Sequence, residues 1–278
     1  MTEDTLLQRH QTHPKPARDM KNKETVRETL DTKGWVKLPS VFSESLIDNI
    51  MEEFNLLAPE FIKIQQQQGI ANLVENTTHH TFVICRRMLH LLEDECVNAF
   101  LHDYFEGPFI LNTMGLSQIS NTNKTYTENI HRDIRSFSGS NRLWLNAIIL
   151  LTDSTVDNGA TWMLEGSQHV AEKPEEAFFY ENAVRATGKK GDMILFDGNM
   201  WHAAGRNTTP EPRYIITPFY SKPYIKQQLD YPRALGIDFG KTLSNELAQI
   251  LGYNAMVPVS LNEFYQPDEY RFYKKDQG

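Results

Sequence analysis

Two histidines and one aspartate in the second half of the chain have the residue types and spacing of a metal site. His131 and Asp133 form a His-x-Asp triplet. Alternate residues of an extended chain project to the same face, so both side chains could reach one metal ion. His202 follows a predicted strand at 192–196 and a Gly198-Asn199 turn, where a loop would present it at the rim of a sheet. Two imidazoles and one carboxylate make the facial triad of non-haem Fe(II) enzymes, although the same ligands also suit zinc.

An arginine eleven residues after His202 adds a second chemical requirement. Arg213 begins a predicted strand at 213–220, in which Arg213, Ile215, Thr217 and Phe219 share one face. If that face points into the protein, the buried guanidinium needs an anionic partner, and a bidentate carboxylate fits best. If it points outward, Arg213 is an ordinary solvent-facing residue at the start of a strand.

The elements that would position these residues change in character along the chain. Up to about residue 105 the pattern is mostly helical, with a short strand at 34–39, a helix capped by Ser43 and a helical segment at 81–105. From about residue 108, short apolar runs end at Gly, Asn, Asp or Pro. These predicted strands are 109–120, 143–151, 160–164, 192–196 and 213–220. An amphipathic helix at 243–251, ended by Gly252, follows.

This order predicts a mainly β protein, a sandwich or barrel with helices packed on one face. We expect a flexible N-terminal tail at 1–24, followed by a single domain at 25–278 with its β core at about 108–221.

Composition excludes several classes of protein. The 278 residues carry a formal charge of −8 and no dense basic patch, which disfavours a nucleic-acid partner. No apolar run approaches the roughly 18 residues that cross a bilayer, so we expect no membrane partner. Two cysteines cannot form a disulfide framework or a thiolate zinc site. With no signal-peptide pattern at the N-terminus, these features favour a cytoplasmic protein.

Several motifs together resemble the phytanoyl-CoA dioxygenase family of Fe(II)/2-oxoglutarate oxygenases. The resemblance runs from Trp35 to about Tyr265 and includes the His-x-Asp triplet and Gly191–Phe196 before His202. It also includes Asp157-Asn158-Gly159-Ala160 leading into Glu165-Gly166-Ser167-Gln168-His169, and Asn207 and Arg213 at family spacing. Ala203-Ala204 stands where family members often carry Gly-Ser, and Glu165 replaces a usual proline.

The resemblance implies a double-stranded β-helix (a cupin-like jelly roll) with bound Fe(II), 2-oxoglutarate as co-substrate, and O₂. It implies that His131, Asp133 and His202 bind the iron and that Arg213 clamps the distal carboxylate of 2-oxoglutarate. Gln118 would contact the other end of the co-substrate, and His169 would be structural. No catalytic residue is expected beyond the metal centre.

The implied reaction is hydroxylation of an unactivated C–H bond in a small molecule, as in the tailoring of a natural product. Asp133 argues against halogenation, because related halogenases carry a small residue there. Desaturation and ring formation stay open. The resemblance points to a polar, guanidine-containing alkaloid as substrate, and we expect specificity to lie at 60–90, at 135–141 and after Tyr220.

Two alternatives belong to other classes of protein. A non-catalytic binding barrel would keep the strands and bind no iron. A zinc hydrolase would use the same ligands with a general base beside the bound water, and Glu165 is the nearest candidate.

Overall fold

A six-stranded antiparallel sheet forms the frame of the protein. The structure is a computed structural model that describes residues 23–74, 76–122 and 126–277. Along this major sheet the strands occur in the order β1-β7-β4-β9-β3-β2. Their bounds are β1 Trp35–Leu38, β2 Thr77–His79, β3 Ile110–Ile119, β4 Trp144–Leu150, β7 Met193–Asp197 and β9 Arg213–Ser221.

A smaller sheet of three strands, in the order β6-β5-β8, faces the major sheet and is called the minor sheet below. Its strands are β5 Thr161–Met163, β6 Val184–Ala186 and β8 His202–Ala203. An isolated antiparallel bridge between His131 and His202 adds the extended segment around His131 to its edge. Met163 and Ala186 of this sheet share one apolar cluster with Ile148, Ile194 and Ile215 of the major sheet. The two facing sheets form the predicted double-stranded β-helix, so the fold class is confirmed.

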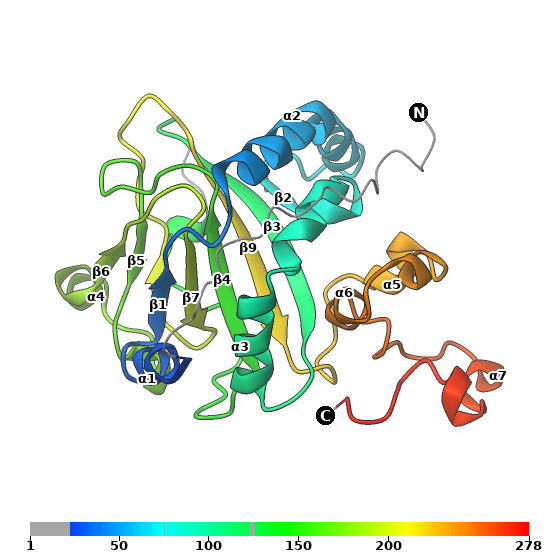
Figure 1. The fold of residues 1–278 in the computed structure, drawn as a ribbon. Helices are drawn as coiled ribbons and strands as arrows, with labels where there is room; N and C mark the ends of the chain where they lie inside the picture. Colours follow the sequence, from blue (N-terminus) through cyan, green and yellow to red (C-terminus); the bar gives the residue numbers. More distant parts are fainter. Residues whose placement is uncertain (1–22, 75, 123–125, 278) are drawn as a thin grey trace.

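Helices cover the outer face of the major sheet (Figure 1). A second, larger cluster joins α1, α2, α3, α5 and α6 to the outward residues of the sheet. In Figure 1, α5, α6 and α7 lie on the side of β3 away from β5 and β6. The helices are α1 Lys23–Lys33, α2 Glu44–Gln67, α3 Glu95–Phe105, α4 Glu176–Asn182, α5 Tyr231–Leu235, α6 Asn245–Ile250 and α7 Leu261–Phe264.

Strand β4 shows why its sequence is an almost continuous apolar run. Leu145 and Ile149 belong to the outer cluster under the helices, whereas Ile148 and Leu150 belong to the cluster between the sheets. A strand buried on both faces needs apolar residues at every position. Asn146, which interrupts the run, is fully buried on the inner face.

The register of β3 and β9 places the predicted face of β9 between the sheets. Arg213 lies opposite Ile119, and Thr217 lies opposite Gly115. Ile119 and Ile215 both belong to the inner cluster. Arg213 therefore points into the protein and not into solvent.

The five predicted strand segments of the β core are all strands, and the strand at 34–39 and the helix capped by Ser43 are also present. The segment 81–105 differs from the prediction, since only α3 is an α-helix. Two 3₁₀ segments, Thr81–Val83 and Arg86–Leu92, precede it. The Asp94 side chain accepts from the backbone N–H groups of Cys96 and Val97 and so sets a new helix start. The predicted tail lies almost wholly outside the described residues, within which no helix is long and apolar enough to cross a membrane.

A substitution at Gly191 tests how tightly the segment between β1 and α2 packs against the turn before β7. Its φ is +86°, and a Cβ there would lie 2.2 Å from the carbonyl oxygen of Phe42. We expect Gly191→Ala to lower the free energy of unfolding by about 3 kcal/mol, from left-handed strain plus the clash. Gly69, with φ of +70° and no neighbour within 4 Å, is the matched control. Gly69→Ala should cost only about 1 kcal/mol in urea denaturation, and equal losses in the two variants would contradict the clash.

Candidate metal and anion-binding site

The fold brings the three predicted metal ligands together. One ligand atom from each of His131, Asp133 and His202 lies within 4.8 Å of the others. The Nε2 atoms of His131 and His202 each lie 3.5 Å from a different carboxylate oxygen of Asp133. Residues 71 positions apart in the chain thus converge on one point at the edge of the minor sheet.

Main-chain hydrogen bonds fix the two histidines relative to each other. The N–H of His131 donates to the carbonyl of His202 at 3.0 Å, and the reverse bond is 2.9 Å. Each Nδ1 lies near the carbonyl oxygen two residues earlier, 2.7 Å from that of Asn129 and 3.0 Å from that of Met200. Because a carbonyl only accepts, both Nδ1 atoms carry the hydrogen, which leaves the Nε2 lone pairs for a metal ion.

Asp133 is oriented by a buried amide of the major sheet. The Nδ2 of Asn146 on β4 donates to the Oδ2 of Asp133 at 2.6 Å. Asn146 is fully buried, and its Oδ1 has no hydrogen-bond partner among the described residues. This amide fixes one carboxylate oxygen from behind.

The pKa values of the triad favour a carboxylate with at least one neutral imidazole. Burial, aided by the charge of His131, lowers the pKa of His202 to about 4. Burial raises the pKa of Asp133, but the two histidines and the Asn146 amide outweigh it, and the net pKa is lowered. Burial lowers the pKa of His131, but the hydrogen bond and charge of Asp133 outweigh it, and the net pKa is raised.

The middle residue of the triplet points the other way, as alternation requires. The guanidinium of Arg132 stacks on Trp201, with 4.1 Å between Cζ and the ring centroid. Its Nη2 donates to the carbonyls of Val170 and Ala171. Arg132 thereby ties the ligand segment to the outside of the minor sheet.

Arg213 is buried with one nitrogen unsatisfied. The residue is 1% exposed. Its Nε donates to the carbonyl of Asn158 at 3.2 Å and its Nη2 to that of Gly159 at 2.6 Å. Nη1 has no partner, and no carboxylate of the described residues forms an ion pair with the guanidinium. Burial and the nearby Arg185 lower the pKa of Arg213 to about 10, so it remains charged at neutral pH.

The structure does not bring Gln118 to this site. Gln118 pairs with Tyr214, whereas Ile119 pairs with Arg213. Residues directly opposite each other share a face, so Gln118 lies on the helix-covered face and Arg213 on the inner one. The prediction that Gln118 contacts a co-substrate beside Arg213 is wrong by one position in the strand. Ser117 occupies the inner face instead.

Other inner-face residues were not predicted as site residues. Thr161 lies two residues after Gly159 and shares its side of β5 with Met163 of the inner cluster. Ser117, Thr217 and Phe219 are partly exposed although they lie within the sheet, so solvent reaches this part of the interior. Alternation from Arg213 already places Thr217 and Phe219 on this face, and alternation from Gly159 could have added Thr161, whereas Ser117 follows only from the register of β3 with β9.

Two further residues singled out from the sequence, Glu165 and His169, contact residues other than the three metal-ligand candidates. Glu165 accepts from the indole of Trp35 at 3.1 Å and pairs with Lys33 at 3.4 Å. His169 bonds the carbonyl of Asp31 at 2.9 Å through Nε2, a structural contact.

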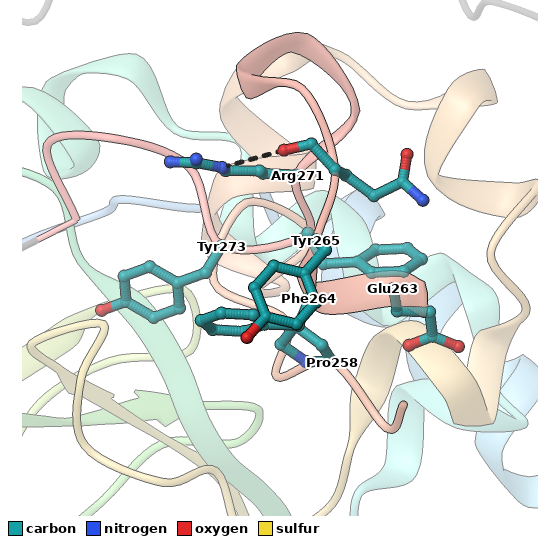
Figure 2. Close-up of a pocket in the computed structure, with 8 residues that line it drawn as sticks. Pro258, Glu263, Phe264, Tyr265, Arg271 and Tyr273 are labelled. Atoms are coloured by element: carbon teal, nitrogen blue, oxygen red, sulfur yellow. Dashed lines mark hydrogen bonds between the residues drawn. The ribbon is translucent and has the colours of Figure 1, made fainter. Parts of the chain in front are cut away.

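A pocket of about 510 Å³ lies in the C-terminal segment, well separated in sequence from the predicted site (Figure 2). Phe264 and Tyr265 pack edge to face there, and Arg271 Nε donates to the carbonyl of Gln266 at 3.2 Å. None of the predicted site residues lines it.

A double-stranded β-helix with two histidines and an aspartate at the edge of the minor sheet defines a class of metal-binding proteins. The sequence profile of the family described as Phytanoyl-CoA dioxygenase (PhyH) matches residues 30–215. The chain belongs to the phytanoyl-CoA dioxygenase family.

Relatives with curated names share parts of the sequence. An uncharacterized protein of Mycobacterium tuberculosis is 37% identical over 134 residues, 48% of this chain and 49% of that one. Dioxygenase cdmA of Talaromyces verruculosus is 24% identical over 237 residues, 76% of this chain and 78% of that one. The chain thus matches about half the length of the first relatives.

Solved structures share the fold. EctD from S. alaskensis, solved with 2-oxoglutarate and 5-hydroxyectoine, has a TM-score of 0.61 at 21% identity, covering 75% of this chain and 79% of that one. The non-heme alpha ketoglutarate dependent epimerase SnoN from nogalamycin biosynthesis has a TM-score of 0.57 at 18% identity, covering 72% and 82%.

Asn146 provides a test of the geometry at the metal ligands. Asn146→Ala removes the donor to Asp133 Oδ2 and frees the carboxylate to rotate. We expect the affinity for Co(II), measured by equilibrium titration, to fall about 10- to 100-fold. Asn98, 6% exposed and bonded to the carbonyl of Leu92, is a matched buried amide elsewhere. Asn98→Ala should cost stability and leave Co(II) affinity unchanged; equal Co(II) affinity in both variants would exclude the orienting role of Asn146.

Proposed function

We propose that this protein is an Fe(II)/2-oxoglutarate-dependent oxygenase that hydroxylates a small molecule. The observation that carries the proposal is that two groups with unused binding capacity, a set of metal ligands and a buried arginine, occur in the same β-helix. One is a group of three ligands with free Nε2 and carboxylate donors. The other is a buried guanidinium with an unsatisfied nitrogen and no acidic partner among the described residues.

The ligand set fits iron. His131, Asp133 and His202 would occupy one face of the ion and leave three positions for exogenous ligands. Asn129 and Met200 hold the imidazoles in the tautomer that binds a metal, and Asn146 holds the carboxylate. When bound, iron with 2-oxoglutarate supplies O₂ activation: one oxygen atom enters succinate as CO₂ leaves, and the other enters the substrate. The side chains of this chain bind and orient the reactants and need not act as acids or bases.

Arg213 fits the distal carboxylate of 2-oxoglutarate. A guanidinium desolvated to this degree requires an anion, and the described residues supply only neutral carbonyls to it. Nε and Nη2 each donate one hydrogen to a carbonyl, which leaves both hydrogens of Nη1 and the second hydrogen of Nη2. The carboxylate could therefore accept from the Nη1–Nη2 edge, in the bidentate arrangement expected from the sequence.

The two alternatives from other classes are less well supported. The zinc hydrolase needs Glu165 as a base, but Trp35 and Lys33 engage that carboxylate. It also gives Arg213 no role. A non-catalytic barrel has no need for two histidines with both Nδ1 atoms fixed towards carbonyls.

Names among the relatives and neighbours support small-molecule oxidation of varied outcome. The relative ausU of Aspergillus calidoustus, 29% identical over 119 residues, is named an iron/alpha-ketoglutarate-dependent dioxygenase. SnoN is named an epimerase. For this chain we infer hydroxylation, with desaturation or cyclisation as other fates of the same substrate radical. The resemblance in sequence suggests a guanidine-containing alkaloid, 7-deoxycylindrospermopsin, as the first substrate to test.

Anaerobic titration tests the co-substrate. Wild type with Fe(II) should develop the visible charge-transfer band of the 2-oxoglutarate chelate. Arg213→Ala should bind 2-oxoglutarate about 100-fold more weakly, because removing the guanidinium leaves the distal carboxylate buried without a positive partner. The affinity of Arg213→Lys should lie between those of wild type and Arg213→Ala. No band in wild type, or equal affinity in Arg213→Ala, would refute the co-substrate assignment.

Turnover tests the reaction and the substrate separately. With 7-deoxycylindrospermopsin, mass spectrometry should find one added oxygen atom, and succinate should form in equal amount. A loss of two hydrogens with succinate formation would indicate desaturation, and turnover that does not depend on 2-oxoglutarate would contradict the oxygenase. His131→Ala should abolish both products.

A further inference from the structure

The turn that holds Arg213 is itself held by a second arginine. Four carbonyls between Val156 and Ala160 accept hydrogen bonds from guanidinium groups. The two central carbonyls, of Asn158 and Gly159, accept from Arg213. The two flanking carbonyls, of Val156 and Ala160, accept from Arg185 at 2.9 and 2.8 Å. The turn thus lies between two guanidinium groups.

Arg185 comes from β6, on the side of the minor sheet away from the interior. It pairs in register with Trp162, and its Cζ lies 4.3 Å from the centroid of that indole ring. Stacking on the ring leaves the edge of the guanidinium free to reach both carbonyls. The side chain is half-buried, and no acidic residue in the described ranges forms an ion pair with it. Its charge is close enough to lower the pKa of Arg213.

Two glycines bring the turn and Arg185 into close contact. Gly159 has φ of +89°, and a Cβ on it would lie 2.4 Å from the carbonyl oxygen of Gly205. A Cβ on Gly205 would lie 2.2 Å from Nη2 of Arg185 and 2.5 Å from the carbonyl oxygen of Ala160. The backbone of Gly159 therefore packs against that of Gly205, and Gly205 packs against the guanidinium of Arg185, with no room for a side chain at either glycine. A displacement of Arg185 would be transmitted to the carbonyls that aim Arg213.

We propose that Arg185 is a positioning residue for the co-substrate, acting through the 156–160 turn on Arg213. Its Nε and Nη2 form a two-point fork that holds the turn in the conformation that engages Nε and one hydrogen of Nη2 of Arg213. The remaining hydrogens of Nη1 and Nη2 are thereby directed to the ligand. The charge of Arg185, which the nearby Asp157 offsets in part, adds a favourable field for a dianion. This inference rests on the proposed function, because the ligand concerned is the distal carboxylate of 2-oxoglutarate.

Two variants separate the fork from the charge. Arg185→Lys keeps the charge and loses the fork, whereas Arg185→Gln keeps an amide donor and loses the charge. The probes are 2-oxoglutarate and 2-oxovalerate, which has the same 2-oxo acid head and chain length but no distal carboxylate. Equilibrium binding to the Fe(II) protein is measured anaerobically for each.

Arg185→Gln should weaken 2-oxoglutarate binding about tenfold and Arg185→Lys about threefold, as expected for loss of partly compensated hydrogen bonds and one nearby charge. Binding of 2-oxovalerate should change less than twofold in both variants. In the Arg213→Ala background, Arg185→Lys should cause no further loss, because it keeps the charge and the effect of the lost fork passes through Arg213.

The control is Arg271→Gln, which removes the same charge at the C-terminal segment (Figure 2) and should leave both affinities unchanged. Equal weakening of 2-oxoglutarate and 2-oxovalerate would show that Arg185 supports the fold alone and would overturn the proposal. Unchanged 2-oxoglutarate binding in Arg185→Gln would also overturn it. Failure of wild type to bind 2-oxoglutarate would instead refute the proposed function.

Discussion

The pair of main-chain hydrogen bonds between His131 and His202 is the constraint on which the site depends. These bonds join the segment around His131 to β8 at the edge of the minor sheet. The two imidazoles therefore project from residues that lie directly opposite each other in an antiparallel bridge. Their ring centroids lie 4.2 Å apart. Each Nδ1 then finds the carbonyl two residues earlier, by the same local geometry at both positions. A metal site assembled in this way needs only one further ligand, and alternation in the extended chain supplies Asp133 from the same segment as His131.

The major sheet separates two functions by its two faces. Its outer face packs under helices, and the large apolar cluster joins it to residues that come mostly from the helices and connecting segments. Its inner face carries the polar residues that the site uses, including Asn146 behind Asp133 and Arg213 at the start of β9. Each buried polar group costs free energy unless it is bonded. Asn146 bonds the metal-ligand candidate Asp133, whereas Arg213 bonds two carbonyls and keeps one nitrogen without a partner. Helix packing stabilises the sheet from outside, so the inner face can retain incompletely paired groups such as Arg213 Nη1 and Asn146 Oδ1.

Much of this arrangement follows from sequence because the strands of the core have strong patterns. The apolar run at 143–151 and the alternation from Arg213 to Phe219 each identify a strand and, for the second, the residues that share a face with Arg213; the structure shows that this face points inward. The short strands β2, β6 and β8 are not predicted, because their two or three residues, unlike those of β5, do not lie in an apolar run and are ordered by pairing with neighbours. Gln118 shows the related failure for a side chain: a shift of one residue reverses the face, and spacing from His131 does not fix that parity. Arg185 has no signal at all, since its contacts are made to carbonyls of a turn 25 and 29 residues earlier.

The charges of the interior explain why a dianion suits this site better than a monoanion. Asp133 carries one negative charge, and a divalent ion bound to it would leave one positive charge in excess. Arg213 adds a second positive charge that no acidic group of the described residues compensates. In a low-dielectric interior both charges need compensation close by, one at the metal and one at the guanidinium. A 2-oxo acid with a second carboxylate at its far end neutralises both with one molecule, whereas a monocarboxylate would leave Arg213 buried and unpaired. If the protein binds iron and 2-oxoglutarate as proposed, the positions of these two charges, which the backbone fixes, would select the length of the co-substrate.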